Sequence, residues 1–176
     1  MIDTPLGKAI EFDGVDDAIF VDVHPLAGAS AFTWEVIFRP DSGGNPEQRF
    51  FHFQERNLAG ESTNTRMLFE TRLTGKEWYL DSFALSGPNS KALIDPGKKH
   101  PADRWYHIAA VYDGKWYRNY VNGVLQNEAQ LELAPQGQGH TSIGVRINLR
   151  DYFKGAIHKA RMTKRALAPK DFLPNP

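Results

Sequence analysis

The chain has 176 residues, of which 41% are hydrophobic and 24% charged, the composition of an ordinary globular protein with a substantial core. Lysine plus arginine and aspartate plus glutamate each total 21, so the net charge is zero and argues against a nucleic-acid binder. The absence of cysteine excludes disulfides, thiolate metal sites and a cysteine nucleophile, and no apolar run is long enough to span a membrane.

The first half of the sequence alternates between apolar and polar residues with the period of two that is typical of β-strands. The segments 40–46 and 58–64 are polar or rich in Gly and Pro and predict loops. Residues 74–77 predict the turn of a hairpin. The predicted strands of this half are Phe32–Arg39, Arg49–Gln54, Arg66–Leu73 and Trp78–Leu85.

The second half continues the pattern after residues 86–104, which are rich in Pro, Gly, Lys and Asp and predict mostly a long loop. Asp113-Gly114 and Asn122-Gly123 are signals for hairpin turns. We predict strands over 105–112, 115–121, 124–133, 141–147 and 153–164, and one helical turn over 168–172. Many short strands without a helical stripe predict an all-β sandwich or barrel, which we assign as one domain over residues 1–176.

Several motifs follow one another along the chain: Phe12–Asp17, Phe32–Pro40, Trp105–Gly114, Tyr120–Gly123 and the tail Phe153–Leu167. This ordered set resembles the laminin-G-like branch of the concanavalin A-like lectin/glucanase superfamily. The resemblance covers nearly the whole chain and implies a jelly-roll sandwich of two antiparallel sheets. The sequence departs from the family pattern at Ile37, where tryptophan is usual, and at His158-Lys159, where the family has Asp-Glu.

The resemblance also raises the question of a structural calcium ion, which some relatives hold between acidic residues of the head and the tail. The candidate ligands are Asp13, Asp16 and Asp17, but a histidine and a lysine at the tail supply no anionic oxygen. Turn chemistry also explains the three aspartates, and we favour that interpretation over a calcium site. We therefore expect no metal and no other cofactor.

Enzymes of the same superfamily suggest two catalytic alternatives. Laminarinase-type glucanases place two glutamates beside an aspartate on one strand, whereas Glu35 has only Thr33 and Ile37 as same-face neighbours. We predict instead that Glu35 forms a buried pair with Arg161. Jelly-roll alginate lyases resemble the chain in Glu70-Thr71-Arg72 and in Tyr152-Phe153-Lys154, but their Gln-x-His element is missing. The strand histidines at 52, 107 and 158 are predicted to be hydrogen-bonded structural groups, so no catalytic residue is assigned.

We predict a ligand site from aromatic and arginine side chains that are not needed to fill the core. Sugars stack on aromatic rings, and arginine binds carboxylates or sulfates. Alternation places Arg66, Glu70 and Arg72 on one strand face. The full set of candidate ligand-binding residues is Arg66, Glu70, Arg72, Trp78, Trp116 and Arg118.

These residues and the resemblance favour a non-catalytic module that binds a glycan or polysaccharide. The module would act attached to or beside other domains of an extracellular or periplasmic protein whose signal peptide has been removed, with neither nucleic acid nor membrane insertion involved. The alternatives are a polysaccharide lyase or glycoside hydrolase of the jelly-roll type, and a protein-interaction or structural module.

Overall fold

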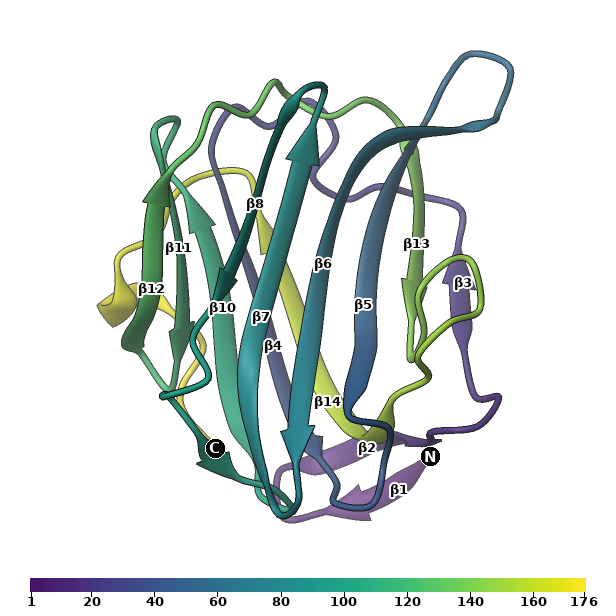
Figure 1. Ribbon diagram of the computed structural model, residues 1–176, viewed down its shortest axis with the longest axis vertical. Coiled ribbons are helices and arrows are strands. Elements are labelled where there is room, and N and C mark those ends of the chain that lie inside the picture. Colours follow the sequence, from purple (N-terminus) through teal and green to yellow (C-terminus); the bar gives the residue numbers. More distant parts are fainter.

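The computed structural model describes all residues, Met1–Pro176, and consists of two β-sheets that pack face to face (Figure 1). One layer, called the β4 sheet here, contains β1 (Ile2–Thr4), β2 (Gly7–Asp13), β4 (Phe32–Pro40), β10 (Tyr106–Tyr112), β11 (Trp116–Val121), β12 (Val124–Gln130) and β14 (Lys154–Thr163). The other, the β6 sheet, contains β3 (Ile19–Val21), β5 (Glu47–Arg56), β6 (Ser62–Thr74), β7 (Glu77–Ser86), β8 (Asn89–Ile94), β9 (His100–Pro101) and β13 (Gly139–Ile143).

The strand order is β1-β2-β14-β4-β10-β11-β12 in the β4 sheet and β3-β13-β5-β6-β7-β8 in the β6 sheet, with β9 paired to β7. Every pair of neighbouring strands runs antiparallel. The predicted all-β sandwich of two antiparallel sheets is therefore confirmed. The head and tail motifs of the chain pair with each other, because Phe12 of β2 lies opposite Gly155 of β14.

Aromatic side chains from both sheets fill the space between the layers. Trp34 of β4 packs against Phe51, Phe53 and Phe69 of the β6 sheet, with ring centroids 5.2, 4.3 and 4.0 Å away. Each fully buried ring of this kind contributes about 1.5–3 kcal/mol by leaving water. The residues that alternate with these core side chains point outward, so the core fixes which side chains each sheet presents on its outer face.

The structure corrects the prediction that residues 86–104 form mostly a loop, because β8 and β9 lie within this segment. Of the residues of β8, only Leu93 is buried. An edge strand with few buried residues has no strict alternation, and here pairing with the neighbouring β7 forms the strand. The predicted helical turn is present as the 3-10 turn η1 (Pro169–Asp171).

Two local irregularities shape the outer face of the β6 sheet. A register shift in β5 between Arg49 and Phe51 lets Phe50 and Phe51 both reach the core, while Arg49 and His52 stay on the outer side. Beyond β13, the chain turns at Gly144 (φ +87°), where a Cβ atom would lie 2.3 Å from the ring of Phe12. The loop over 145–151 that follows folds back against β5.

Candidate functional site

The ligand-binding residues predicted from the sequence fall into three separate places. Arg66, Glu70 and Arg72 lie on β6 and point away from the core, as the alternation predicted. Trp78 does not join them: its side chain is 0% exposed and packs between the sheets against Phe38, with ring centroids 5.2 Å apart. The proposed surface role of Trp78 is thus wrong, because strand alternation cannot tell which of two faces turns inward.

Trp116 and Arg118 lie on β11, on the outer face of the opposite sheet. Arg118 donates hydrogen bonds to Asp113 at 2.7 Å and to Glu128 at 3.0 Å, and its guanidinium lies 5.6 Å from the ring centroid of Trp116. These contacts pair the charge of Arg118 fully. The predicted set therefore forms no single surface. The residues on β6 and those on β11 lie on opposite outer faces of the sandwich, with the core between them.

A polar pocket of about 210 Å³ opens on the outer face of the β6 sheet. It is smaller than the roughly 300–1,000 Å³ pockets of drug-sized ligands, so it has room for one residue or one substituent of a larger ligand. The lining side chains come from four strands and the 145–151 loop: Arg49, Arg66, Leu68, Glu70, Arg72, Asp81, Phe83, Ala92 and Arg146.

One side of the pocket is a network of paired charges. Arg72 of β6 donates to Asp81 of β7 at 2.7 Å and to Glu70 at 3.3 Å, and pairs with Glu47 of β5 at 2.5 Å. Arg49 pairs with Glu70 at 3.2 Å and also contacts Asp151. Cross-strand register produces this cluster, because Glu70 lies directly opposite both Arg49 and Asp81.

Glu70 is the most perturbed carboxyl of this network. Burial and the neighbouring Asp81 carboxylate outweigh the guanidinium groups of Arg49 and Arg72 and raise the pKa of Glu70 to about 7. Burial likewise raises the pKa of Asp81, and its Oδ1 atom is buried without a hydrogen-bond partner. The pocket therefore holds a carboxyl that titrates near neutral pH beside a buried carboxylate oxygen that has no hydrogen-bond partner within the protein.

The opposite side of the pocket carries arginines without carboxylate partners. Arg146 enters from the loop and forms no side-chain hydrogen bond or ion pair, and Arg66 bonds only to Asn64. Burial lowers the pKa of both arginines, and neighbouring guanidinium groups lower it further. Since arginine stays charged in proteins, both guanidinium groups keep their positive charge, which Glu70 offsets only in part.

His52 lies beside these arginines, 1% exposed. Its Nδ1 accepts a hydrogen bond from the backbone N–H of Ile147 at 3.2 Å, so Nε2 carries the proton and has no partner. Burial and then the charges of Arg146 and Arg66 lower the pKa of His52 to about 3, which keeps the ring neutral. His107 donates a hydrogen bond to the Glu35 carboxylate and His158 donates one to the Lys8 carbonyl, so all three strand histidines have the structural contacts predicted.

Glu35, the other buried glutamate, has the partners that its burial requires. Its carboxylate accepts hydrogen bonds from Arg161 at 2.5 Å, from His107 at 3.1 Å and from the N–H of Leu173 at 2.6 Å. The predicted pair of Glu35 with Arg161 is confirmed. The side chain is 0% exposed, so a polysaccharide could not reach it.

The lyase-like motifs do not meet in space. Glu70 and Arg72 lie on β6, whereas Lys154 begins β14 in the other sheet and Phe153 is a fully buried core residue. No tyrosine lines the pocket. The constellation that would combine Tyr152 with Glu70 is therefore not assembled.

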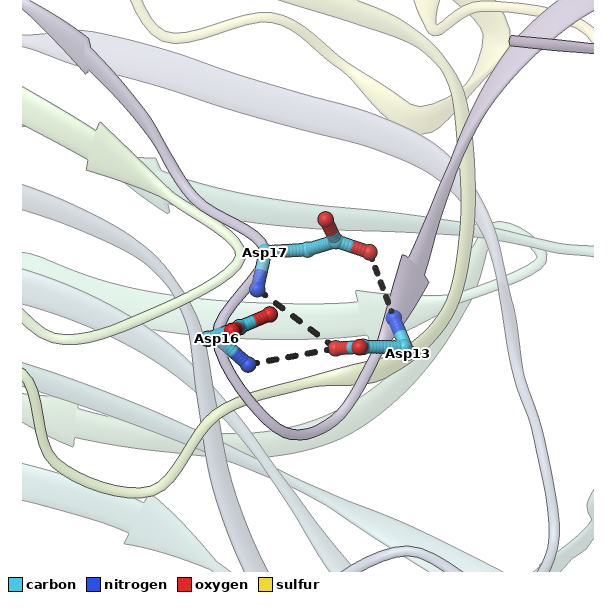
Figure 2. Close-up of side chains that lie close together, drawn as sticks. All are labelled: Asp13, Asp16 and Asp17. Atoms are coloured by element: carbon cyan, nitrogen blue, oxygen red, sulfur yellow. Dashed lines mark hydrogen bonds between the residues drawn. The ribbon is translucent and has the colours of Figure 1, made fainter.

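The three head aspartates gather in the turn after β2, with one oxygen of each within 4.8 Å of the others (Figure 2). Oδ1 of Asp13 accepts the backbone N–H groups of Val15 at 2.7 Å and Asp16 at 3.2 Å, and Oδ2 of Asp17 accepts that of Asp13 at 3.0 Å. The bond from Val15 is the main reason that the pKa of Asp13 is lowered. Backbone hydrogen bonds account for this cluster as an aspartate-stabilised turn, and we assign no metal to it.

Sequence reasoning missed most of the pocket. Arg49, Asp81 and Arg146 were not candidates, although Arg49 and Asp81 also lie outward on predicted strands. Their registers against Glu70 could have identified them once the strand order was known. Arg146 approaches from a loop far away in sequence, and no local pattern indicates where such a loop folds.

A family model described as the concanavalin A-like lectin/glucanases superfamily matches residues 13–171. Domain 4 of an extracellular GH43 arabinanase from Geobacillus stearothermophilus, solved with arabinotriose, has a TM-score of 0.70 at 18% identity, covering 96% of this chain and 76% of that one. The CBM40 of a Ruminococcus gnavus IT-sialidase, solved with α2,3-sialyllactose, has a TM-score of 0.68 at 14% identity, covering 93% and 94%.

A heptameric SAP-like pentraxin from Limulus polyphemus is similar with a TM-score of 0.65 at 15% identity, covering 92% of this chain and 77% of that one. No curated protein matches the chain. At these identities the solved structures support the fold alone. The structure also lacks a helix that could cross a membrane.

Proposed function

Because the family model spans residues 13–171, the chain belongs to the concanavalin A-like lectin/glucanases superfamily, and from this premise we propose that it is a non-catalytic carbohydrate-binding module. The proposed site is the polar pocket on the outer face of the β6 sheet. The module would act beside other domains of an extracellular or periplasmic protein.

The observation that carries the proposal is the combination of fixed, partly buried polar groups around one hollow. Arg72 and Glu70 are held by cross-strand ion pairs, so they are oriented before a ligand arrives. Arg66 lies over Phe83, with its guanidinium 5.2 Å from the ring centroid. Leu68 and Phe83 add apolar surface to the lining, and a few oriented polar groups beside such surface can fix the orientation of a ligand.

The similar structures give the proposal its ligand class. The arabinanase domain and the CBM40 were each solved with an oligosaccharide. In both comparisons more than nine tenths of this chain is matched. The comparisons supply the class of ligand and not the particular sugar, because at 18% and 14% identity the binding residues do not correspond one to one.

A glycan array followed by affinity gel electrophoresis in polysaccharide gels tests the proposal. We expect retention in at least one gel without release of reducing ends or loss of polymer viscosity. Ala92→Trp, which fills the pocket from an exposed position on β8 without removing a charge, should abolish retention. The matched control is Ala166→Trp, at an exposed position outside the pocket. If both variants were retained equally, the ligand would not bind in the pocket.

Glu70 supports a second candidate function, a glycoside hydrolase, because general acids in such enzymes have raised pKa values and a second carboxylate nearby. Against this interpretation, residues Glu70 and Asp81 are only 5% and 3% exposed, and their carboxylates share Arg72 as a partner. Release of sugar products that stops in Glu70→Gln would establish the hydrolase. Silence in both assays would favour a protein-interaction module.

A further inference from the structure

Arginines of the pocket divide sharply by the partners that they have. Arg49 and Arg72 each contact two or more carboxylates, whereas Arg66 and Arg146 contact none. A guanidinium group that is partly removed from water and unpaired is costly, since its charge is neither solvated fully nor neutralised. Such an unfavourable arrangement is expected where a bound ligand supplies the missing negative charge.

The free edge of Arg66 has the geometry that an oxyanion requires. Its Nη1 donates to the carbonyl and the side-chain oxygen of Asn64, at 3.2 and 3.0 Å. Nε is buried without a partner, and Nη2 donates to nothing. Nε and Nη2 together form the side of the fork that binds a carboxylate or sulfate with two parallel hydrogen bonds. The contacts to Asn64 and Phe83 hold this fork in place.

Arg146 adds a second positive charge to the same end of the pocket. Its charge is the largest coulombic influence on Arg66, and the pKa of each is lowered primarily by burial. Two such cations repel each other in a site of reduced dielectric, and an anion between them would turn this repulsion into attraction. Neutral His52, which lies among these cations, provides no counter-charge.

The rest of the pocket is chemically different from this end. Glu70 and Asp81 lie toward the paired arginines, and Oδ1 of Asp81 is a buried acceptor without a donor. A ligand that carries one anionic group and neighbouring hydroxyl groups would match both ends. Acidic sugars have this combination, and a single residue of such a sugar is in scale with the volume of about 210 Å³.

We propose that Arg66 and Arg146 together bind the anionic substituent, a carboxylate or a sulfate, of an acidic glycan. This inference rests on the proposed function and specifies the substrate class of that site. The same oxyanion chemistry can come from a uronic or sialic acid or from a sulfated sugar. Binding should weaken as salt is raised, because one charge is neutralised on the ligand.

The test uses the full chain and glycans in matched pairs: polygalacturonate and its carboxyl-reduced form, α2,3-sialyllactose and lactose, and heparin and its desulfated form. We expect at least one acidic member to bind and its counterpart, which lacks that carboxylate or sulfate, to bind at least about tenfold more weakly, as for a lost charge-assisted hydrogen bond. Preference within the polygalacturonate and sialyllactose pairs identifies a carboxylate, and preference within the heparin pair identifies a sulfate.

Arg146→Gln and Arg66→Gln should each weaken binding of the acidic member by about 10- to 100-fold. The matched control is Arg150→Gln, which removes the same charge from the same loop outside the pocket and should change the affinity by less than about twofold. The inference would be overturned if both members of every pair bound equally, or if Arg146→Gln bound the acidic member as tightly as the Arg150→Gln control. Glycan binding itself would still stand. Failure of every glycan in the panel and on the array would contradict the proposed function itself.

Discussion

The outer faces of the two sheets each bury a glutamate beside an arginine, yet the two clusters differ in how completely they are paired. On the β4 sheet, hydrogen bonds from His107, Arg161 and the Leu173 N–H outweigh burial and hold the pKa of Glu35 below its ordinary value. On the β6 sheet, burial and Asp81 outweigh the arginines and raise the pKa of Glu70 to about 7.

The C-terminal segment is the physical source of this difference. It covers the outer face of the β4 sheet, where Phe172 packs against His107 and Tyr120 with ring centroids 5.5 and 5.3 Å away. No segment covers the pocket of the β6 sheet in the same way, so its polar groups are left partly buried and incompletely paired. The same residue types are fully paired on one face and incompletely paired on the other, where we propose the ligand site.

The largest expected effect comes from breaking the paired cluster. Arg161→Met leaves the Glu35 carboxylate buried without its main cation, and we expect the free energy of unfolding to fall by about 3 kcal/mol. Arg118→Met removes an arginine of the same sheet whose carboxylate partners, Asp113 and Glu128, reach solvent, so it should cost less than about 1 kcal/mol. Urea denaturation of both variants measures the difference, and equal losses would contradict the assigned role of Glu35.

The pH dependence of stability should separate the two glutamates by sign. Because the pKa of Glu70 is raised from 4.5 to about 7, the folded state binds more protons than the unfolded state between these values. Stability should therefore fall as pH rises through this window, by on the order of 1 kcal/mol per unit for one proton. Glu35 acts in the opposite direction: its stabilisation is present above 4.5 and is lost as pH falls below that value.

Glu70→Gln isolates the contribution of Glu70 to this profile. The groups that face it are Arg49 and Glu47 from β5, Arg72 from its own strand and Asp81 from β7. Asp81 has a raised pKa and contributes with the same sign, so the slope should become shallower rather than vanish. Urea titrations at several pH values measure the slope, and an unchanged slope in the variant would mean that Glu70 is ionised throughout.

The smallest expected effect on stability comes from replacing the unpaired Arg146. Arg146→Gln breaks no hydrogen bond or ion pair within the protein, so the free energy of unfolding should stay within about 0.5 kcal/mol of the parent value. Thermal denaturation of the variant beside Arg161→Met checks this. A loss comparable to that of Arg161→Met would mean that Arg146 is a structural residue and that the two faces do not differ as described.

The sequence predicted the parts of the site that strand alternation controls. It placed Arg66, Glu70 and Arg72 together because side chains two residues apart share a strand face. It misplaced Trp78 for the same reason, since alternation leaves the inward face undefined. Long-range features lay beyond this reasoning, including the register that brings Asp81 beside Glu70.

The fold was easier to predict than the site, and for a physical reason. Core strands such as β4 and β10 combine buried aromatic or aliphatic residues with recognisable turns, so local sequence marks them. The edge strand β8 has one buried residue and depends on its neighbour, and Arg146 depends on a loop that folds over β5. Ligand sites on sheet surfaces are made of such non-local contacts.

The most direct test of the account is to map the bound glycan by backbone amide NMR, using the strongest ligand from the array. We predict that chemical-shift changes concentrate in β5, β6, β7 and the 145–151 loop, with the largest changes near Arg66 and Arg146. Changes concentrated on β11 around Trp116, or at the turn of Asp13 and Asp17, would contradict the assignment of the site to the outer face of the β6 sheet.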